Sequence, residues 1–185
     1  GTDNTTATFR LRDAFGNPIS GANVTFALTG DGTLSSVVET PAASGNYVAT
    51  LTAATTVQTA NVAVLLDGNP FGFDQDVDYV AGPVSLVTST IEASTNPVTV
   101  EQNTTVTVTL RDAQGNLVEN YLDGGGTLAA AFNNSVLAFT SAFAEAGNGR
   151  YSRTAQAGFN PGTGSVTWNV GGSNSPNTLD ITVVA

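Results

Sequence analysis

The carboxylates are the side chains of this chain best placed by type and spacing to do chemistry. Asp74, Asp76 and Asp78 alternate within FDQDVDY, so an extended backbone would place them on one face. Calcium prefers such oxygen ligands, six to eight of them at about 2.3–2.6 Å. On a straight strand, however, Asp74 and Asp78 would lie roughly 13 Å apart, so one ion would need a bulge or a loop carboxylate such as Asp31 or Asp67. We expect a charged outer face that opposes aggregation, with calcium binding as the alternative.

A second candidate is an Arg-Asp pair that occurs twice, ending in Asp13 and in Asp112. Either aspartate could be an acid or a metal ligand, but neither has a second carboxylate at a fixed spacing. Aspartate also begins tight turns by accepting a backbone N–H, and Gly16 and Gly115 can supply the positive φ that such turns need. We therefore predict structural turns, with each preceding arginine on the outer face and available for a surface ion pair.

The residue types that are missing exclude several mechanisms. The chain has no cysteine, histidine or lysine, which removes disulfides, thiolate nucleophiles, the commonest general base and Schiff-base chemistry. The net charge of −10 disfavours binding to nucleic acid or to anionic membranes. No apolar run approaches 18 residues, so direct membrane insertion is not expected. We find no active site, predict that the protein is not an enzyme, and expect no cofactor unless calcium binds.

The elements that must position these residues are written twice in the sequence. Residues 4–17 and 103–116 are identical at ten of fourteen positions, at an offset of 99. Later in the chain the offset is 104, since residues 76–81 correspond to 180–185. A repeat of about 100 residues is the size of an immunoglobulin-like sandwich. We predict two domains, at 1–81 and 82–185.

The periodicity within each repeat is two, which is typical of half-buried strands. In the first repeat, Ala7, Phe9 and Leu11 alternate with polar residues. Clusters of Gly, Asn, Asp and Pro separate the predicted strands. The fold class is therefore all-β, with two tandem immunoglobulin-like antiparallel β-sandwiches. Further strands of the first repeat are expected at 22–28, 33–38, 46–53, 60–67 and 72–80.

One strand of the first sandwich is expected to be missing from this chain. Residues 84–100 supply a first strand or two before the second repeat, whereas Gly1 is already the counterpart of Val100. The chain contains no methionine, so we expect a processed or excised piece of a longer array. The alternative is a first sandwich that is completed by another chain through strand addition.

Five residues were inserted once, between Asn116 and about Thr127. In a sandwich of this topology, the connection after the second strand lies at the end where the chain enters the domain. We therefore predict that Tyr121 and Leu122 pack at the junction beside Gly82 and Pro83 and limit its bending. An exposed binding loop is the alternative.

The motifs resemble a known family. The segments LRDAFGNPISGANVTF and GNYVATLTA, followed by a strand ending in VAG, look like the bacterial immunoglobulin-like repeats of intimin and invasin type adhesins, also called Big_1-like. The resemblance covers nearly all of both repeats, although the second replaces VTF with TLAAAF. It implies tandem modules in a stalk on the bacterial cell surface, neighbouring similar repeats in one polypeptide.

These observations predict a non-enzymatic structural spacer of an extracellular adhesin stalk. One alternative is a subunit of a homopolymeric fibre, in which the incomplete first sandwich accepts a strand from the next molecule. Another is a carbohydrate-binding accessory module that uses Trp168. We expect Trp168 to be a core residue instead, because Val166 and Val170 share its parity.

Overall fold

The computed structural model describes residues 3–185, and every regular element in that range is a β-strand. The strands form two compact units, of which the first ends at Val80 and the second begins at Ala81. The predicted fold class, all-β with antiparallel sandwiches of the immunoglobulin-like kind, is confirmed. No helix in the described range is long and apolar enough to cross a membrane.

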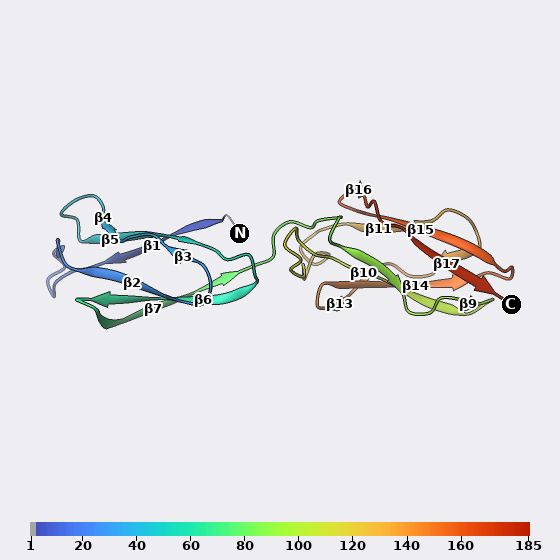
Figure 1. Ribbon diagram of the computed structural model, residues 1–185, viewed down its shortest axis with the longest axis horizontal. Helices are drawn as coiled ribbons and strands as arrows, with labels where there is room; N and C mark the ends of the chain where they lie inside the picture. Colours follow the sequence, from blue (N-terminus) through green and yellow to red (C-terminus); the bar gives the residue numbers. More distant parts are fainter. Residues whose placement is uncertain (1–2) are drawn as a thin grey trace. The chain divides into compact units, whose positions relative to one another are not determined.

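The first unit is built from two sheets (Figure 1). One has the order β1-β5-β3, with β4 also on β5, and the other has the order β2-β6-β7. All of these pairs are antiparallel. The strands are β1 (Asn4–Arg10), β2 (Val24–Thr29), β3 (Thr33–Leu34), β4 (Val38–Glu39), β5 (Asn46–Thr52), β6 (Gln58–Leu66) and β7 (Asn69–Tyr79).

The prediction of a single strand at 33–38 is wrong, because the structure has two short strands there, β3 and β4. Between the two paired stretches, residues 35–37 face only residues 49–50 of β5. One extra residue on one strand produces a bulge. Here Ser35 fills the gap, since its Oγ accepts a hydrogen bond from the N–H of Thr50 at 2.9 Å.

The second unit has two larger sheets, of orders β12-β14-β10-β8 and β11-β15-β17-β9, with β13 on β14 and β16 on β15. Only β9 and β17 pair in parallel among the described strands. The strands are β8 (Thr90–Ala93), β9 (Val98–Thr99), β10 (Asn103–Thr109), β11 (Leu128–Phe132), β12 (Leu137–Phe139), β13 (Ala144–Gly147), β14 (Arg150–Ala157), β15 (Gly162–Val170), β16 (Ser173–Asn174) and β17 (Leu179–Val184).

Each core lies between the two sheets of its own unit. In the first, Tyr47 of β5 packs with Val24 and Val64 of the other sheet. In the second, Trp168 is 1% exposed and packs with Tyr151. The prediction that Trp168 is a core residue is confirmed, although its indole N–H has no hydrogen-bond partner among residues 3–185.

The two units use the same strand register. Phe9 pairs with Tyr47 across β1 and β5, and Val108 pairs with Tyr151 across β10 and β14. These pairs obey the offsets of 99 and 104 read from the sequence. The β6–β7 and β15–β17 pairs obey the second offset as well. Equivalent positions of the repeats can therefore be compared residue by residue.

Candidate functional site

The first Arg-Asp loop is a tight turn closed by its aspartate. The Oδ1 atom of Asp13 accepts hydrogen bonds from the backbone N–H groups of Phe15 and Asn17, both at 2.8 Å. The side-chain amide of Asn17 also donates to Asp13 and, with these N–H groups, holds the pKa of Asp13 below its ordinary value. Gly16 has φ 86° and Gly115 has φ 89°, as the predicted turns require. The loop is exposed, and the hydrogen bonds of Asp13 hold the turn together.

The second loop has the same contacts and one more. Asp112 is 2% exposed, and its Oδ1 accepts from the N–H groups of Gln114 and Asn116. Its Oδ2 accepts from the Asn116 amide and, at 2.9 Å, from the N–H of Gly82. Burial raises the pKa of Asp112, but these donors outweigh it and lower the pKa to about 2. This carboxylate therefore holds the segment that enters its unit.

Further hydrogen bonds extend this attachment along the entering segment. Val84 forms an isolated bridge with Asp112, and the N–H of Ser85 donates to the carbonyl of Arg111 at 2.8 Å. The hydroxyl of Thr88 donates to the carbonyl of Asp112 at 2.7 Å. Gly82 and Pro83, predicted at the junction, thus begin a segment that is fixed to the second unit. Their effect on bending stays a prediction.

Among residues 3–185, neither loop arginine forms the surface ion pair for which we predicted it to be available. Arg12 donates to the carbonyls of Leu11 and Gly45 and to the Asn46 side chain. Arg111 donates to the carbonyl of Gly115 at 2.7 Å. A guanidinium has five donors and no acceptor, so it can satisfy several backbone carbonyls at once. Arg111 thus stabilises its own turn, whereas Arg12 connects the segment just after β1 to residues 45 and 46 at the start of β5.

The carboxylates of β7 form a row on its outer face. Asp76 accepts a hydrogen bond from Asn61, and Asp78 accepts one from Thr59, each across the β6–β7 pair. Asp74 lies opposite Ala63. Among residues 3–185, no three or more acidic side chains come together where they could hold a metal ion. Calcium binding at this row therefore stays a proposal, and the charged face is what the contacts support.

The inserted loop of the second repeat packs against its own unit. The N–H of Tyr121 donates to the hydroxyl of Tyr151, which in turn donates to the carbonyl of Val118. The two tyrosine rings meet edge to face, with centroids 6.4 Å apart. The N–H of Leu122 donates to Glu145, and both Tyr121 and Leu122 pack on the core cluster of Trp168. The junction role of this loop and its alternative, a binding role, both stay predictions.

The first unit has a groove between β1 and β7. These strands are the edges of different sheets, so the groove opens where the two sheets face each other. One part, of about 420 Å³, reaches the core residues Leu51 and Val62. The adjoining part, of about 580 Å³, lies beside Phe9, Phe71 and Phe73. The groove is therefore open into the hydrophobic core.

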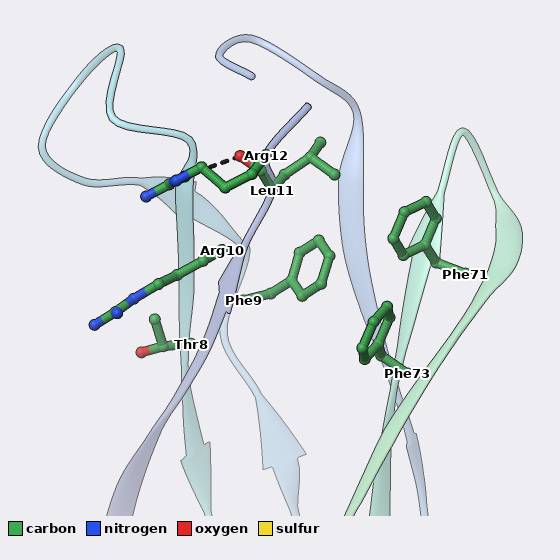
Figure 2. A pocket seen from close by; sticks show the side chains of 7 residues that line it. All are labelled: Thr8, Phe9, Arg10, Leu11, Arg12, Phe71 and Phe73. Carbon is green, nitrogen blue, oxygen red and sulfur yellow. Dashed lines mark hydrogen bonds between the residues drawn. The ribbon is translucent and has the colours of Figure 1, made fainter. Parts of the chain in front are cut away.

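The three phenylalanines gather at one end of this groove, as Figure 2 shows. Phe9 points from β1 toward Phe71 and Phe73 of β7, whereas Thr8 and Arg10 point to the other side of the strand. The ring centroids of the three pairs lie 5.6–5.8 Å apart. Phe73 is nevertheless 60% exposed and Phe71 38% exposed. An apolar cluster with this exposure is typical of a contact surface.

Sequence reasoning missed this site. Phe73 lies in the predicted strand at 72–80 and Phe71 just before it, and side chains two residues apart on a strand share one face. In β1, Phe9 is one of the apolar residues that alternate with polar ones. These signals predict inward-facing residues but do not show that β1 and β7 are both open edges. That fact depends on the order of strands in the sheets, which local patterns leave undetermined.

Comparison with known proteins identifies similar chains. The family described as "Invasin, domain 3" matches residues 1–82 and 85–185. No curated protein sequence matches the chain. Among solved structures, the adhesin FdeC of Escherichia coli is 31% identical and has a TM-score of 0.67. The alignment covers 99% of this chain and 60% of FdeC.

Two further structures extend the comparison. InvD of Yersinia pseudotuberculosis is 26% identical with a TM-score of 0.74, and the alignment covers 98% of this chain and 52% of InvD. Invasin, described as a bacterial integrin-binding protein, is 24% identical with a TM-score of 0.77, over 97% of this chain and 36% of invasin. The likeness to invasin shows the fold. In all three cases this chain spans less than two thirds of the similar protein.

Proposed function

The chain belongs to the family described as invasin domain 3, and on that premise we propose that its two units are non-enzymatic spacer modules in the stalk of a bacterial surface adhesin. The similar protein FdeC is described as an adhesin, and it is 31% identical over 99% of this chain. A stalk of this kind sets the distance between the cell and whatever lies at its tip. The expected neighbours are similar repeats of the same polypeptide, outside the cell.

The observation that carries the proposal is the attachment of the linking segment. Strand β7 ends at Tyr79, and Gly82 is already bonded to Asp112 of the second unit. Only Val80 and Ala81 lie between the last residue of one sheet and the first anchored residue of the next unit. A linker of two residues has few conformations to lose or to explore. Such a connection suits a module that transmits length rather than one that swings freely.

The charge and side-chain inventory fits the same role. Asp76 and Asp78 are engaged by neutral partners on the outer face of β7. A charged strand face opposes edge-to-edge association between neighbouring molecules. The most perturbed carboxylate, Asp112, is committed to a turn. These contacts support a structural role for the three carboxylates.

The spacer role can be tested with spin labels, because the chain has no native cysteine to remove. Phe15→Cys and Phe159→Cys place labels on two side chains that are 90% and 78% exposed, one in each unit. Pulsed electron resonance then gives the distribution of distances between the units. We expect a single distribution about as narrow as that of a pair within one unit, Phe15→Cys with Val57→Cys.

A second pair of variants separates the linker from the fold. Asp112→Asn keeps the shape of the side chain but weakens its contacts with Gly82 and the turn, so the distance distribution should broaden. Asp13→Asn is the matched control in the first unit and should leave the distribution unchanged. A broad distribution in the unmodified sequence would show free swinging and contradict the spacer proposal.

A further inference from the structure

The groove of the first unit has a filled counterpart in the second. There, β8 pairs with β10, and β9 pairs in parallel with β17. Residues 90–99 thus cross from the edge of one sheet to the edge of the other. In the first unit, β1 and β7 are the equivalents of β10 and β17, and no described strand pairs with their outer edges. The second unit therefore displays what an occupant of this groove looks like.

That occupant is held by alternating apolar side chains. Ile91 and Ala93 pack against the core of the second unit from β8, and Val98, 1% exposed, is buried within it. Under this cover Val106 and Val108 of β10 are 0% exposed. The equivalent residues of β1, Ala7 and Phe9, are partly exposed, although both strands carry apolar residues at these two positions. The difference lies in the cover and not in the strand.

Backbone contacts fix the occupant at both edges. Ser94 exchanges hydrogen bonds with Thr105, and the hydroxyl of Thr104 both donates to the carbonyl of Thr95 and accepts from its N–H. On the other sheet, Asn96 bonds the backbone of Asp180 and Thr182. In the first unit the same places are held by Thr5, Thr6, Asp76 and Asp78, with matching register. The groups that would bind a strand are present.

The entrance to the groove is also preserved. The N–H of Ala157 donates to the carbonyl of Gln102, and the N–H of Ala53 donates to the carbonyl of the equivalent Asp3. In the second unit only residues 100–102 separate β9 from β10. A strand joined directly before β1 would therefore reach the groove without a long connection. Loop closure at this length costs little entropy.

We propose that the groove between β1 and β7 seats an extended strand from a neighbouring repeat of the same polypeptide, with apolar residues in the pattern of residues 90–99. Only the source of the strand rests on the proposed function. A second copy of this chain is a poorer donor, because its own residues 90–99 are already used. Withdrawing them would expose Val98 and open the second unit. The donor completes the sandwich as an added edge strand.

Near the phenylalanines, the groove of the first unit is more apolar than the equivalent place in the second unit. In the second unit, Asn177 donates to the carbonyls of Leu86 and Ser89 in the segment before β8. Phe73 holds the equivalent position in the first unit, beside Phe9. The donor therefore presents apolar side chains here, where the second unit uses hydrogen bonds. Burial of Phe73, now 60% exposed, is the expected result.

The test compares three forms of the chain by amide hydrogen exchange. One is the sequence as it stands. The second carries a copy of residues 82–99, GPVSLVTSTIEASTNPVT, directly before residue 1, which restores the spacing found in the second unit. The third carries the same extension with Ile91→Asp and Val98→Asp in the copied segment. By the register of β10, the N–H groups of Thr6 and Thr8 point to the open edge.

We expect exchange at Thr6 and Thr8 to slow by at least about tenfold in the second form and not in the third. Ala7 and Phe9, whose N–H groups face β5, are the internal control and should change less. The extended chain should remain a monomer. Equal exchange in all three forms would overturn the proposal, and protection that appears in the first form as concentration rises, with dimers, would assign the groove to a second copy.

A second experiment does not depend on correct folding of the extension. In it, a peptide of residues 84–99 is added to the unextended chain. Its binding should shift the resonances of Thr6, Thr8 and Tyr79, and the same peptide with Ile91→Asp and Val98→Asp should not. Shifts outside β1 and β7, or none, would contradict the proposal. Because this readout does not depend on how the units move, it separates the groove from the spacer role tested by spin labels.

Discussion

Strands β1 and β10 share four of their seven residues but have opposite surroundings. Both begin with Asn-Thr-Thr and both pair with a long antiparallel strand through the same register. Yet Val106 and Val108 of β10 are fully buried, whereas Ala7 and Phe9 of β1 remain partly exposed. The second unit adds β8 and β9 over this region, and the first unit has a groove there. The burial of a strand is thus determined by its neighbours as much as by its own residues.

The two aspartate turns differ in the same way. Asp13 and Asp112 accept the same hydrogen bonds from within their loops. Only Asp112 also accepts one from Gly82, which belongs to the segment that leads into β8. One structural motif therefore has a local role in the first repeat and a linking role in the second. The entering segment accounts for both differences between the units.

The largest predicted effect comes from placing a carboxylate under this segment. Val106→Asp buries a charge in the core cluster that contains Val98 and Ile181 and should cost several kcal/mol, enough to unfold the second unit. The matched Ala7→Asp, beside the open groove, should cost about 1 kcal/mol or less. Trp168 fluorescence during urea unfolding reports the second unit alone, and methyl resonances report the first. Unfolding of the first unit by Ala7→Asp would show that its groove is closed.

Local patterns in the sequence predict most of the strands and turns but not this contrast. The period of two places Ala7, Phe9 and Trp168 on inward faces, and the Asp-Gly spacing predicts both turns. The identical loops around Asp13 and Asp112, however, carry no signal that one is buried. That difference arises from a segment 24–30 residues away along the chain, and the clustering of Phe9 with Phe73 also joins distant strands.

A smaller effect is expected when the linking aspartate is removed. Asp112→Ala deletes an acceptor of backbone hydrogen bonds from three residues and should lower the free energy of unfolding of the second unit by about 2–3 kcal/mol. Asp13→Ala deletes only the exposed equivalent and should destabilise the first unit less. Urea titration followed by Trp168 fluorescence measures the first change, and resonances of β1 measure the second. Equal losses would mean that the contact with Gly82 contributes nothing.

Acid should reveal the same difference between the turns more weakly. The pKa of Asp112 is lowered from 3.8 to about 2, so the unfolded state binds this proton first. The stabilisation is complete above about pH 4 and is lost as the pH falls toward 2. Replacing Asp112 with Asn removes this dependence. Denaturation midpoints between pH 5 and pH 2 should therefore fall more steeply in the unmodified second unit than in Asp112→Asn, and parallel curves would exclude Asp112 as the source.

The smallest predicted effect concerns calcium. Asp76 and Asp78 of the first unit already accept hydrogen bonds from Asn61 and Thr59, and these carboxylates do not converge with Asp74 on one point. Calcium that bound only the folded state would raise the melting temperature by mass action. Without such binding, the melting temperatures in millimolar calcium and in EDTA should agree within error. Asp76→Asn is the matched control. A calcium-dependent rise in melting temperature that this variant abolishes would instead establish a metal site on β7, and would make the outer face of the first unit a second feature that distinguishes it from the other repeat.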